Sequence, residues 1–352
     1  MKRNHRALIC ILIAFLLALT ACAGQSGQPQ GVGADPASPS AETAGERSPG
    51  DFKIVLLLPG PINDQSWNAT NYAGLVESNN VLGTNIEFVE SVQASDFEST
   101  FREYAERGYD LILAAGSQFD EAVANIAPSY PSVTFCVVNG SRADGANVAP
   151  IFPKEYEASY LAGIIAGHVT ENGQFATIGG FPNRPMENLL DVYEKTAVAI
   201  AGARGIEGSR AVRAYANSWD DVALGKQMAE QMIDNGADTL FVYANEVGLG
   251  SIEAARSKGA AFIGFSSDQT VIDPDTVVAS VVFDFKTFYV WAVSQFIAGE
   301  LRGNMVHEAG INEGIFAVVY TDNIGQEIRD AVEDAISTFQ AGGTDLTALF
   351  ES

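Results

Sequence analysis

Residues 53–68 read KIVLLLPGPINDQSWN, which joins a strand pattern to the start of a helix pattern. Its first part is an apolar run that ends at a Pro-Gly pair, which predicts a buried strand over Lys53–Leu58. Its second part gathers amides, a carboxylate, a hydroxyl and an indole just before a helix. Helix starts expose free N–H groups that favour polar ligands, so the loop is a candidate binding site. Helix capping by Asp64 or Ser66 would explain one of these residues, but not the cluster with Trp67.

The same alternation of apolar runs and helical stretches continues along the chain. Further strands are expected at Ile86–Val89, Leu111–Ala114, Val133–Val138, Ala176–Gly179, Arg210–Ala214, Thr239–Tyr243, Ala261–Phe265, Val277–Val282 and Gly314–Val319. Helices are expected near Ser66–Ser78, Phe97–Arg107, Phe119–Ala127, Met186–Ala203, Asp221–Asn235, Gly250–Lys258 and Lys286–Glu300. Strands that alternate with helices indicate parallel sheets covered on both faces. Two successive sets of them predict an α/β protein with two Rossmann-like lobes.

The chain is expected to cross between the two predicted lobes more than once. Lobe 1 is expected to comprise residues 51–153 and 280–310, and lobe 2 residues 154–279 and 311–352. The crossings, and therefore the hinges, are expected at Tyr156–Gly163 and near Ser280 and Gly310. Ligands of open parallel sheets bind beyond the carboxyl ends of the strands, so two facing lobes predict one interlobe cleft.

The first fifty residues predict export and a lipid anchor. Residues 1–21 combine a basic start with the apolar run ALICILIAFLLAL, which is typical of a secretory signal. The signal ends in Leu-Thr-Ala before Cys22, which matches the lipobox of bacterial lipoproteins and predicts acylation of Cys22. An ordinary signal with a chance cysteine is the alternative. Residues 22–50 are rich in Gly, Ser and Pro and are expected to form a disordered tether. An extracytoplasmic, membrane-anchored protein follows.

Charge and the missing motifs exclude several classes of function. The formal charge is −24, and removal of Lys2, Arg3 and Arg6 with the signal would make it about −27, which argues against nucleic acid as a partner. The mature chain keeps His168 and His307, far apart, and has no G-x-S-x-G, HExxH, Walker or CxxC motif. We therefore predict no enzyme, no catalytic residue, no cofactor and no metal site.

Seven motifs in order resemble the basic membrane protein family, which includes a purine nucleoside receptor. They are Asn63-Asp-Gln-Ser-Trp-Asn68 with Tyr72 and Gly74, Gly116-Ser-Gln-Phe-Asp120, Tyr156-Glu-Ala-Ser-Tyr-Leu-Ala-Gly163, Gly179-Gly180, Asn217-Ser-Trp-Asp220, Asn235-Gly-Ala-Asp238 with Gly248-Leu-Gly250, and Gly264-Phe-Ser-Ser-Asp-Gln269. The resemblance implies a type I periplasmic-binding fold, a small-molecule ligand and the permease of an ABC importer as partners.

The resemblance also implies how a purine would be held. Its base-facing polar groups correspond to Asn63, Asp64, Asn68 and Asp120. Its stacking rings correspond to Trp67 or Tyr72 from one lobe and Tyr243 from the other, with Trp219 as a further candidate. The chemistry is consistent, since carboxylates and amides match the donors and acceptors of a purine edge and aromatic rings stack on its faces.

The sequence departs from the family where a ribose would bind. Ser266 replaces the first of two acids, so only Asp268 remains, and Phe283 stands where the family has a lysine. Asn245-Glu246 replaces a glycine pair, and these two residues with Asp268 could supply other contacts. The ligand is therefore expected to be a purine nucleoside, a free purine-like base or another flat heterocycle. The alternatives of this fold are a sugar- or autoinducer-type sensory binding protein and a transcription regulator.

Overall fold

The computed structural model describes residues 47–64 and 67–350. The predicted signal, Cys22 and most of the predicted tether lie outside the described residues. From Arg47 onward the chain packs as one compact unit that contains two sheets. No helix in the part of the chain that the structure describes has the length and apolar character needed to cross a membrane.

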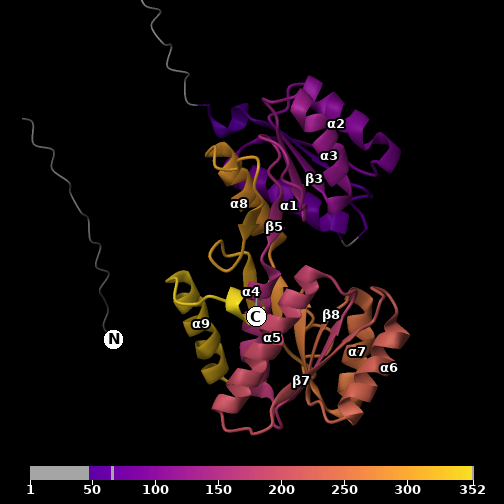
Figure 1. Cartoon of the computed structure of the whole chain (residues 1–352), viewed down its shortest axis with the longest axis vertical. Helices are drawn as coiled ribbons and strands as arrows, with labels where there is room; N and C mark the ends of the chain where they lie inside the picture. Colours follow the sequence, from indigo (N-terminus) through magenta and orange to yellow (C-terminus); the bar gives the residue numbers. More distant parts are fainter. Residues whose placement is uncertain (1–46, 65–66, 351–352) are drawn as a thin grey trace, which may run out of the picture. The chain divides into compact units, whose positions relative to one another are not determined.

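The first sheet has the order β11-β5-β4-β3-β1-β2, and all its strands are parallel. Its strands are β1 (Lys53–Leu57), β2 (Asn85–Val89), β3 (Leu111–Ala115), β4 (Thr134–Val138), β5 (Ile151–Pro153) and β11 (His307–Ala309). Its helices are α1 (Trp67–Leu82), α2 (Phe97–Glu106), α3 (Asp120–Ile126) and α8 (Phe285–Ile297). Successive strand residues enter two different cores, because strand side chains alternate between the faces. The helices α2 and α3 cover one face and α1 and α8 the other (Figure 1).

The second sheet has the order β12-β10-β9-β8-β6-β7 and is parallel except for β12, which runs antiparallel to β10. Its strands are β6 (Gln174–Gly179), β7 (Arg210–Tyr215), β8 (Thr239–Tyr243), β9 (Ala261–Ser266), β10 (Val277–Phe283) and β12 (Phe316–Tyr320). Its helices are α4 (Glu155–Val169), α5 (Arg184–Ala203), α6 (Val222–Asp234), α7 (Asn245–Lys258) and α9 (Gln326–Gln340). The pair α6 and α7 packs on one face, and α4 and α5 pack on the other (Figure 1).

Two parallel α/β lobes of this kind confirm the predicted fold class. Short 3-10 helices join several elements, at Pro49–Asp51, Ala94–Asp96, Ser117–Phe119, Ala127–Ser129 and Thr347–Leu349. The strands β5 and β11 have no counterpart in the sequence prediction. Each has only three residues, which is too short to show a periodic pattern.

The chain passes between the two sheets at three places. It leaves the first sheet after β5, returns after β10, and leaves again after β11. Because β10 pairs with β9 and β12 as far as Phe283, the second crossing lies a few residues beyond the expected position at residue 280. The helix that follows, α8, packs on α1, where Gly74 allows the ring of Tyr289 to approach and Tyr289 Oη donates to Asn71 Oδ1 (2.7 Å).

The buried carboxylate of Glu157 joins two of these crossings. It forms an ion pair with Lys154 Nζ (2.8 Å) and accepts a hydrogen bond from the backbone N–H of Ile311 (2.7 Å). The backbone N–H of Lys154 also donates to Ala309 O (2.8 Å). A Cβ on Gly310 would lie 1.9 Å from Glu157 Oε2, so a glycine is required there. These contacts fasten the crossing after β5 to the crossing after β11.

Candidate functional site

A cavity of about 550 Å³ lies beyond the carboxyl ends of strands from both sheets. This volume falls within the range of roughly 300–1,000 Å³ that is typical of small-molecule sites. The lining residues are Trp67, Thr70, Asn139, Glu155, Tyr243, Asn245, Ser266, Ser267, Asp268, Val282, Phe283 and Phe285. Residues from both lobes therefore meet around one space, in the position that an open parallel sheet gives to its ligand.

Aromatic side chains form much of this wall. The indole of Trp67 is held by a hydrogen bond from Nε1 to Ala115 O (3.0 Å) and meets the ring of Phe285 edge to face, with centroids 5.7 Å apart. Phe285 also packs against Phe283 at 4.1 Å. Tyr243 lies on the other lobe and contacts Phe265 at 4.9 Å. Aromatic faces from both lobes can therefore contact a flat ligand.

Three residues of the lining have a strained backbone. Asn139 (φ 58°), Asn245 (φ 41°) and Ser266 (φ 71°) adopt left-handed conformations, which non-glycine residues rarely do. They follow β4, begin α7 and end β9, respectively. Backbone strain of this kind is maintained mainly at functional sites, so its concentration here supports a binding role for the cavity.

Two buried oxygen atoms beside the cavity have no hydrogen-bond partner among the described residues. They are Oδ1 of Asp120 and Oδ1 of Asn139. Asp120 is 8% exposed, its Oδ2 accepts from the backbone N–H of Ser141 (3.1 Å), and burial raises its pKa. A Cβ on Gly140 would lie 2.7 Å from Asp120 Oδ1, so this oxygen adjoins the turn that carries Asn139. Buried acceptors without donors are costly, and a ligand N–H would satisfy them.

Glu155 closes the cavity at the start of α4. Its Oε1 accepts a hydrogen bond from Tyr243 Oη (2.6 Å), although the two residues are far apart in sequence. Burial raises the pKa of Glu155 to about 7, against the opposing effect of the Tyr243 hydrogen bond. Among the described lining residues, Glu155 and Asp268 are acidic and none is a lysine, arginine or histidine. The cavity is therefore unsuited to anions.

The structure brings some of the residues predicted from sequence into this lining and leaves others outside it. Those in the lining are Trp67, Tyr243, Asn245, Ser266, Asp268 and Phe283. Those outside it are Asn63, Asp64, Asn68, Tyr72, Asp120 and Trp219. Sequence reasoning missed Thr70, Asn139, Glu155, Ser267, Val282 and Phe285. Asn139 directly follows a predicted strand, so the strand-end rule could have found it.

The loop residues outside the lining hold the first loop together. Asp64 Oδ2 accepts from the backbone N–H (2.9 Å) and Nδ2 (2.7 Å) of Asn68, and Asn68 Oδ1 accepts from Gly60 N–H (3.1 Å). Asn63 is exposed. Asp64 and Asn68 thus organise the start of α1, which positions Trp67.

Two of the predicted aromatic residues pack elsewhere. The ring of Tyr72 contacts Phe88 of β2 at 4.6 Å. Trp219 is 38% exposed, covers Gly180 and contacts Phe181 at 5.6 Å. Its backbone oxygen accepts from the N–H of Glu246 (2.9 Å), so it adjoins the start of α7 without lining the cavity.

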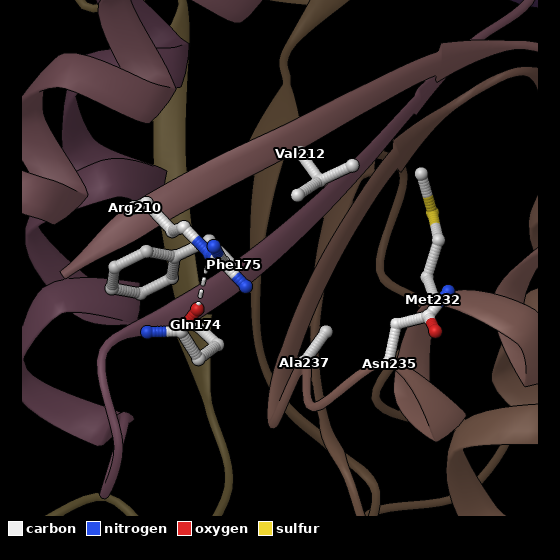
Figure 2. A pocket seen from close by; sticks show the side chains of 7 residues that line it. All are labelled: Gln174, Phe175, Arg210, Val212, Met232, Asn235 and Ala237. Atoms are coloured by element: carbon white, nitrogen blue, oxygen red, sulfur yellow. Dashed lines mark hydrogen bonds between the residues drawn. The ribbon is translucent and has the colours of Figure 1, made fainter. Parts of the chain in front are cut away.

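A second, smaller cavity lies at the other end of the second sheet. Its volume is about 140 Å³, and Figure 2 shows its walls between β6, β7 and α6. Arg210 Nε donates to Gln174 Oε1 (2.7 Å) beside it. Both residues begin strands, whereas the larger cavity lies where strands end. Within residues 47–64 and 67–350, no group of three or more His, Cys, Asp or Glu side chains could hold a metal ion.

Comparison with known proteins agrees with this architecture. The family model of the PnrA-like ABC transporter substrate-binding proteins, Bmp, matches residues 52–338. A nucleoside-binding protein of an ABC transporter from Lactococcus lactis is 27% identical over 81% of this chain and 86% of its own. A transcriptional activator, Med, from Bacillus subtilis is 24% identical over 83% of this chain and 89% of its own.

A solved structure supports the fold alone. The crystal structure of a transcriptional activator of the comK gene from Bacillus halodurans superposes with a TM-score of 0.70 at 23% identity, and covers 83% of this chain and 99% of that chain. The match of the family model extends over most of the chain, including both sheets. The chain therefore belongs to the Bmp family of PnrA-like ABC transporter substrate-binding proteins, and it is a binding protein rather than an enzyme.

Proposed function

We propose that this chain captures a purine nucleoside or a purine-like base in the interlobe cavity and presents it to the permease of an ABC importer. The observation that carries the proposal is the lining of the cavity, where Trp67 and Tyr243 contribute rings from different lobes and no basic residue is present in the described lining. Stacking on aromatic rings contributes about 1–3 kcal/mol per base. The relative from Lactococcus lactis that is named for nucleoside binding supports the same ligand class.

The choice between nucleoside and base depends on Ser266 and Phe283. Both residues line the cavity, and neither carries the charge that its family counterpart would bring to a ribose. Titration calorimetry with adenosine, guanosine, adenine and guanine tests this choice. We expect the free bases to bind at least as tightly as their nucleosides. Nucleosides that bind far more tightly than bases would contradict a base-selective site, and failure of all four to bind would contradict the proposed function.

Replacing Trp67 with alanine is expected to weaken ligand binding by about fivefold to 150-fold, the equivalent of about 1–3 kcal/mol of lost stacking. The same titration measures the effect. Trp219→Ala is the matched control, because Trp219 lies outside the cavity lining and its removal should change the affinity much less. Adenosine monophosphate is a second control, since a lining with two carboxylates should reject its phosphate. Equal losses in the two tryptophan variants would contradict the proposed stacking role.

We also propose that the chain is tied to the membrane by lipid on Cys22, after removal of residues 1–21. The lipobox and the Gly/Ser/Pro-rich stretch that follows support this proposal. Mass spectrometry of the N-terminal peptide from the membrane fraction is expected to find acylated Cys22. An unmodified Cys22, or a chain that still begins at Met1, would contradict the lipid anchor.

Transcriptional activation is a second candidate, favoured by the activator from Bacillus subtilis among the relatives. The formal charge of −24 argues against direct contact with DNA, whose phosphates repel an acidic surface. A gel-shift titration with double-stranded DNA separates the two candidates. Binding of DNA at physiological salt would favour the second candidate over solute capture.

A further inference from the structure

Glu155 occupies a position shared by the cavity and the hinge. It is the first residue of α4 and follows directly on the crossing from the first sheet. It lines the cavity on one side and, on the other, a pocket of about 140 Å³ beside Lys154, Tyr156 and Glu308. A ligand that contacts Glu155 therefore contacts the segment that joins the lobes.

The Glu155 carboxylate retains hydrogen-bonding capacity for a ligand. Tyr243 Oη donates to Oε1, and within the described part of the chain no second side chain or backbone group donates to this carboxylate. An ionised carboxylate accepts only and offers about four acceptor positions. Its remaining capacity is available to N–H or O–H groups inside the cavity.

The charged and titratable groups around Glu155 do not neutralise it. Tyr243 faces it from β8, Asp268 shares the cavity from the segment after β9, and Tyr156 and Glu308 lie on the hinge side. Lys154, the cation that precedes Glu155 in the chain, is already paired with Glu157. Burial accordingly raises the pKa of Glu155 to about 7. A hydrogen-bond donor on the ligand would stabilise the buried negative charge of Glu155, which no cation of the described protein does.

The rest of the site is also rich in acceptors. Oδ1 of Asn139, a lining residue, is buried without a partner among the described residues, and the face of an aromatic ring such as Trp67 is electron-rich. A complementary ligand offers several N–H donors and carries no negative charge. Among purines, those with amino groups fit this description best.

We propose that Glu155 is a specificity-determining residue that accepts a hydrogen bond from an N–H group of an amino-substituted heterocycle and must be ionised to do so. This inference rests on the proposed purine-binding function and identifies the group that recognises the ligand's amino group. Capture then releases the proton that Glu155 holds below neutral pH. The affinity should be constant well above pH 7 and should fall by about tenfold per pH unit well below it, as expected for one linked proton.

Titration calorimetry of adenosine, guanosine, adenine and guanine between pH 5.5 and 8.5 tests this inference. The tightest of the four should show the predicted loss of affinity on acidification. In Glu155→Gln the affinity at pH 8 should be lower and the pH dependence should disappear. In Tyr243→Phe the midpoint should move to higher pH, because the hydroxyl favours the ionised carboxylate, and this variant keeps the aromatic ring.

The control is Glu308→Gln, an exposed carboxylate on the hinge side of Glu155, which should keep the pH dependence of the unaltered protein. Purine binding whose affinity is independent of pH, or rises on acidification, would overturn this inference and leave the proposed function intact. An unchanged pH dependence in Glu155→Gln would overturn it as well. Failure of every purine to bind at pH 8 would overturn the proposed function and this inference together.

Discussion

Replacing Glu157 with alanine is expected to lower the free energy of unfolding by about 3–5 kcal/mol, the usual cost of removing one partner from a buried ion pair. Glu157 is 2% exposed, and its partner Lys154 is 17% exposed. The substitution leaves the ammonium of Lys154 without its counter-ion and the backbone N–H of Ile311 without its acceptor. Chemical denaturation at neutral pH, monitored by tryptophan fluorescence, measures the loss.

Glu308→Gln provides the reference for this experiment. Glu308 is an exposed strand residue near the same crossings, and its substitution should change stability by no more than about 0.5 kcal/mol. Because Glu157 fastens two crossings together, Glu157→Ala should also weaken ligand binding without touching the ligand. A loss of stability below about 1 kcal/mol would show that the ion pair contributes little beyond the cost of burying it.

Replacing Glu155 with glutamine is expected to raise the free energy of unfolding of the ligand-free protein by about 3 kcal/mol at pH 8.5 and by only about 1 kcal/mol at pH 5.5. The pKa of Glu155 in the folded chain is about 7, against an ordinary value of 4.5. The protonated form is therefore favoured by folding. Its stabilising contribution is fully present below pH 4.5 and is lost as the pH rises through about 7.

Glutamine mimics the protonated carboxyl and can still accept from Tyr243 Oη, so it removes only the cost of the charge. Denaturation curves at the two pH values measure the effect, and each pH serves as the reference for the other. An equal change at both values would mean that the pKa of Glu155 is not raised in the folded chain. The same variant is expected to bind purines more weakly, so the ionised Glu155 would lower stability for the sake of ligand recognition.

Local sequence patterns were sufficient to predict most of the elements and the class of fold. The runs that became β1, β3, β4 and β8 are apolar over the length of a strand and end in turn residues, and such patterns depend only on neighbouring residues. The alternation of these runs with amphipathic helices left few arrangements other than parallel sheets covered on both faces. The strand-end rule then directed attention to Trp67, and the family resemblance to Tyr243 and Ser266, and all three line the cavity.

Which side chains face the cavity depends on how the loops fold, and local sequence patterns do not predict it. In the sequence, Asp64 and Asn68 were candidates for contact with a ligand, but in the folded loop they bind each other, and Trp67 lines the cavity. The short strands β5 and β11 form because residues more than a hundred positions apart pair with each other, which no local pattern encodes.

Glu155 shows most clearly which features the sequence predicts and which depend on the folded structure. Its place beside a predicted hinge motif is visible in the sequence, but its burial and its hydrogen bond to Tyr243 exist only once the second sheet has formed. Periodicity is a property of consecutive residues, and so the sequence alone determines it. The pKa of a carboxylate and the partners of its oxygens depend on groups brought close from distant parts of the chain, and so only the tertiary structure decides them.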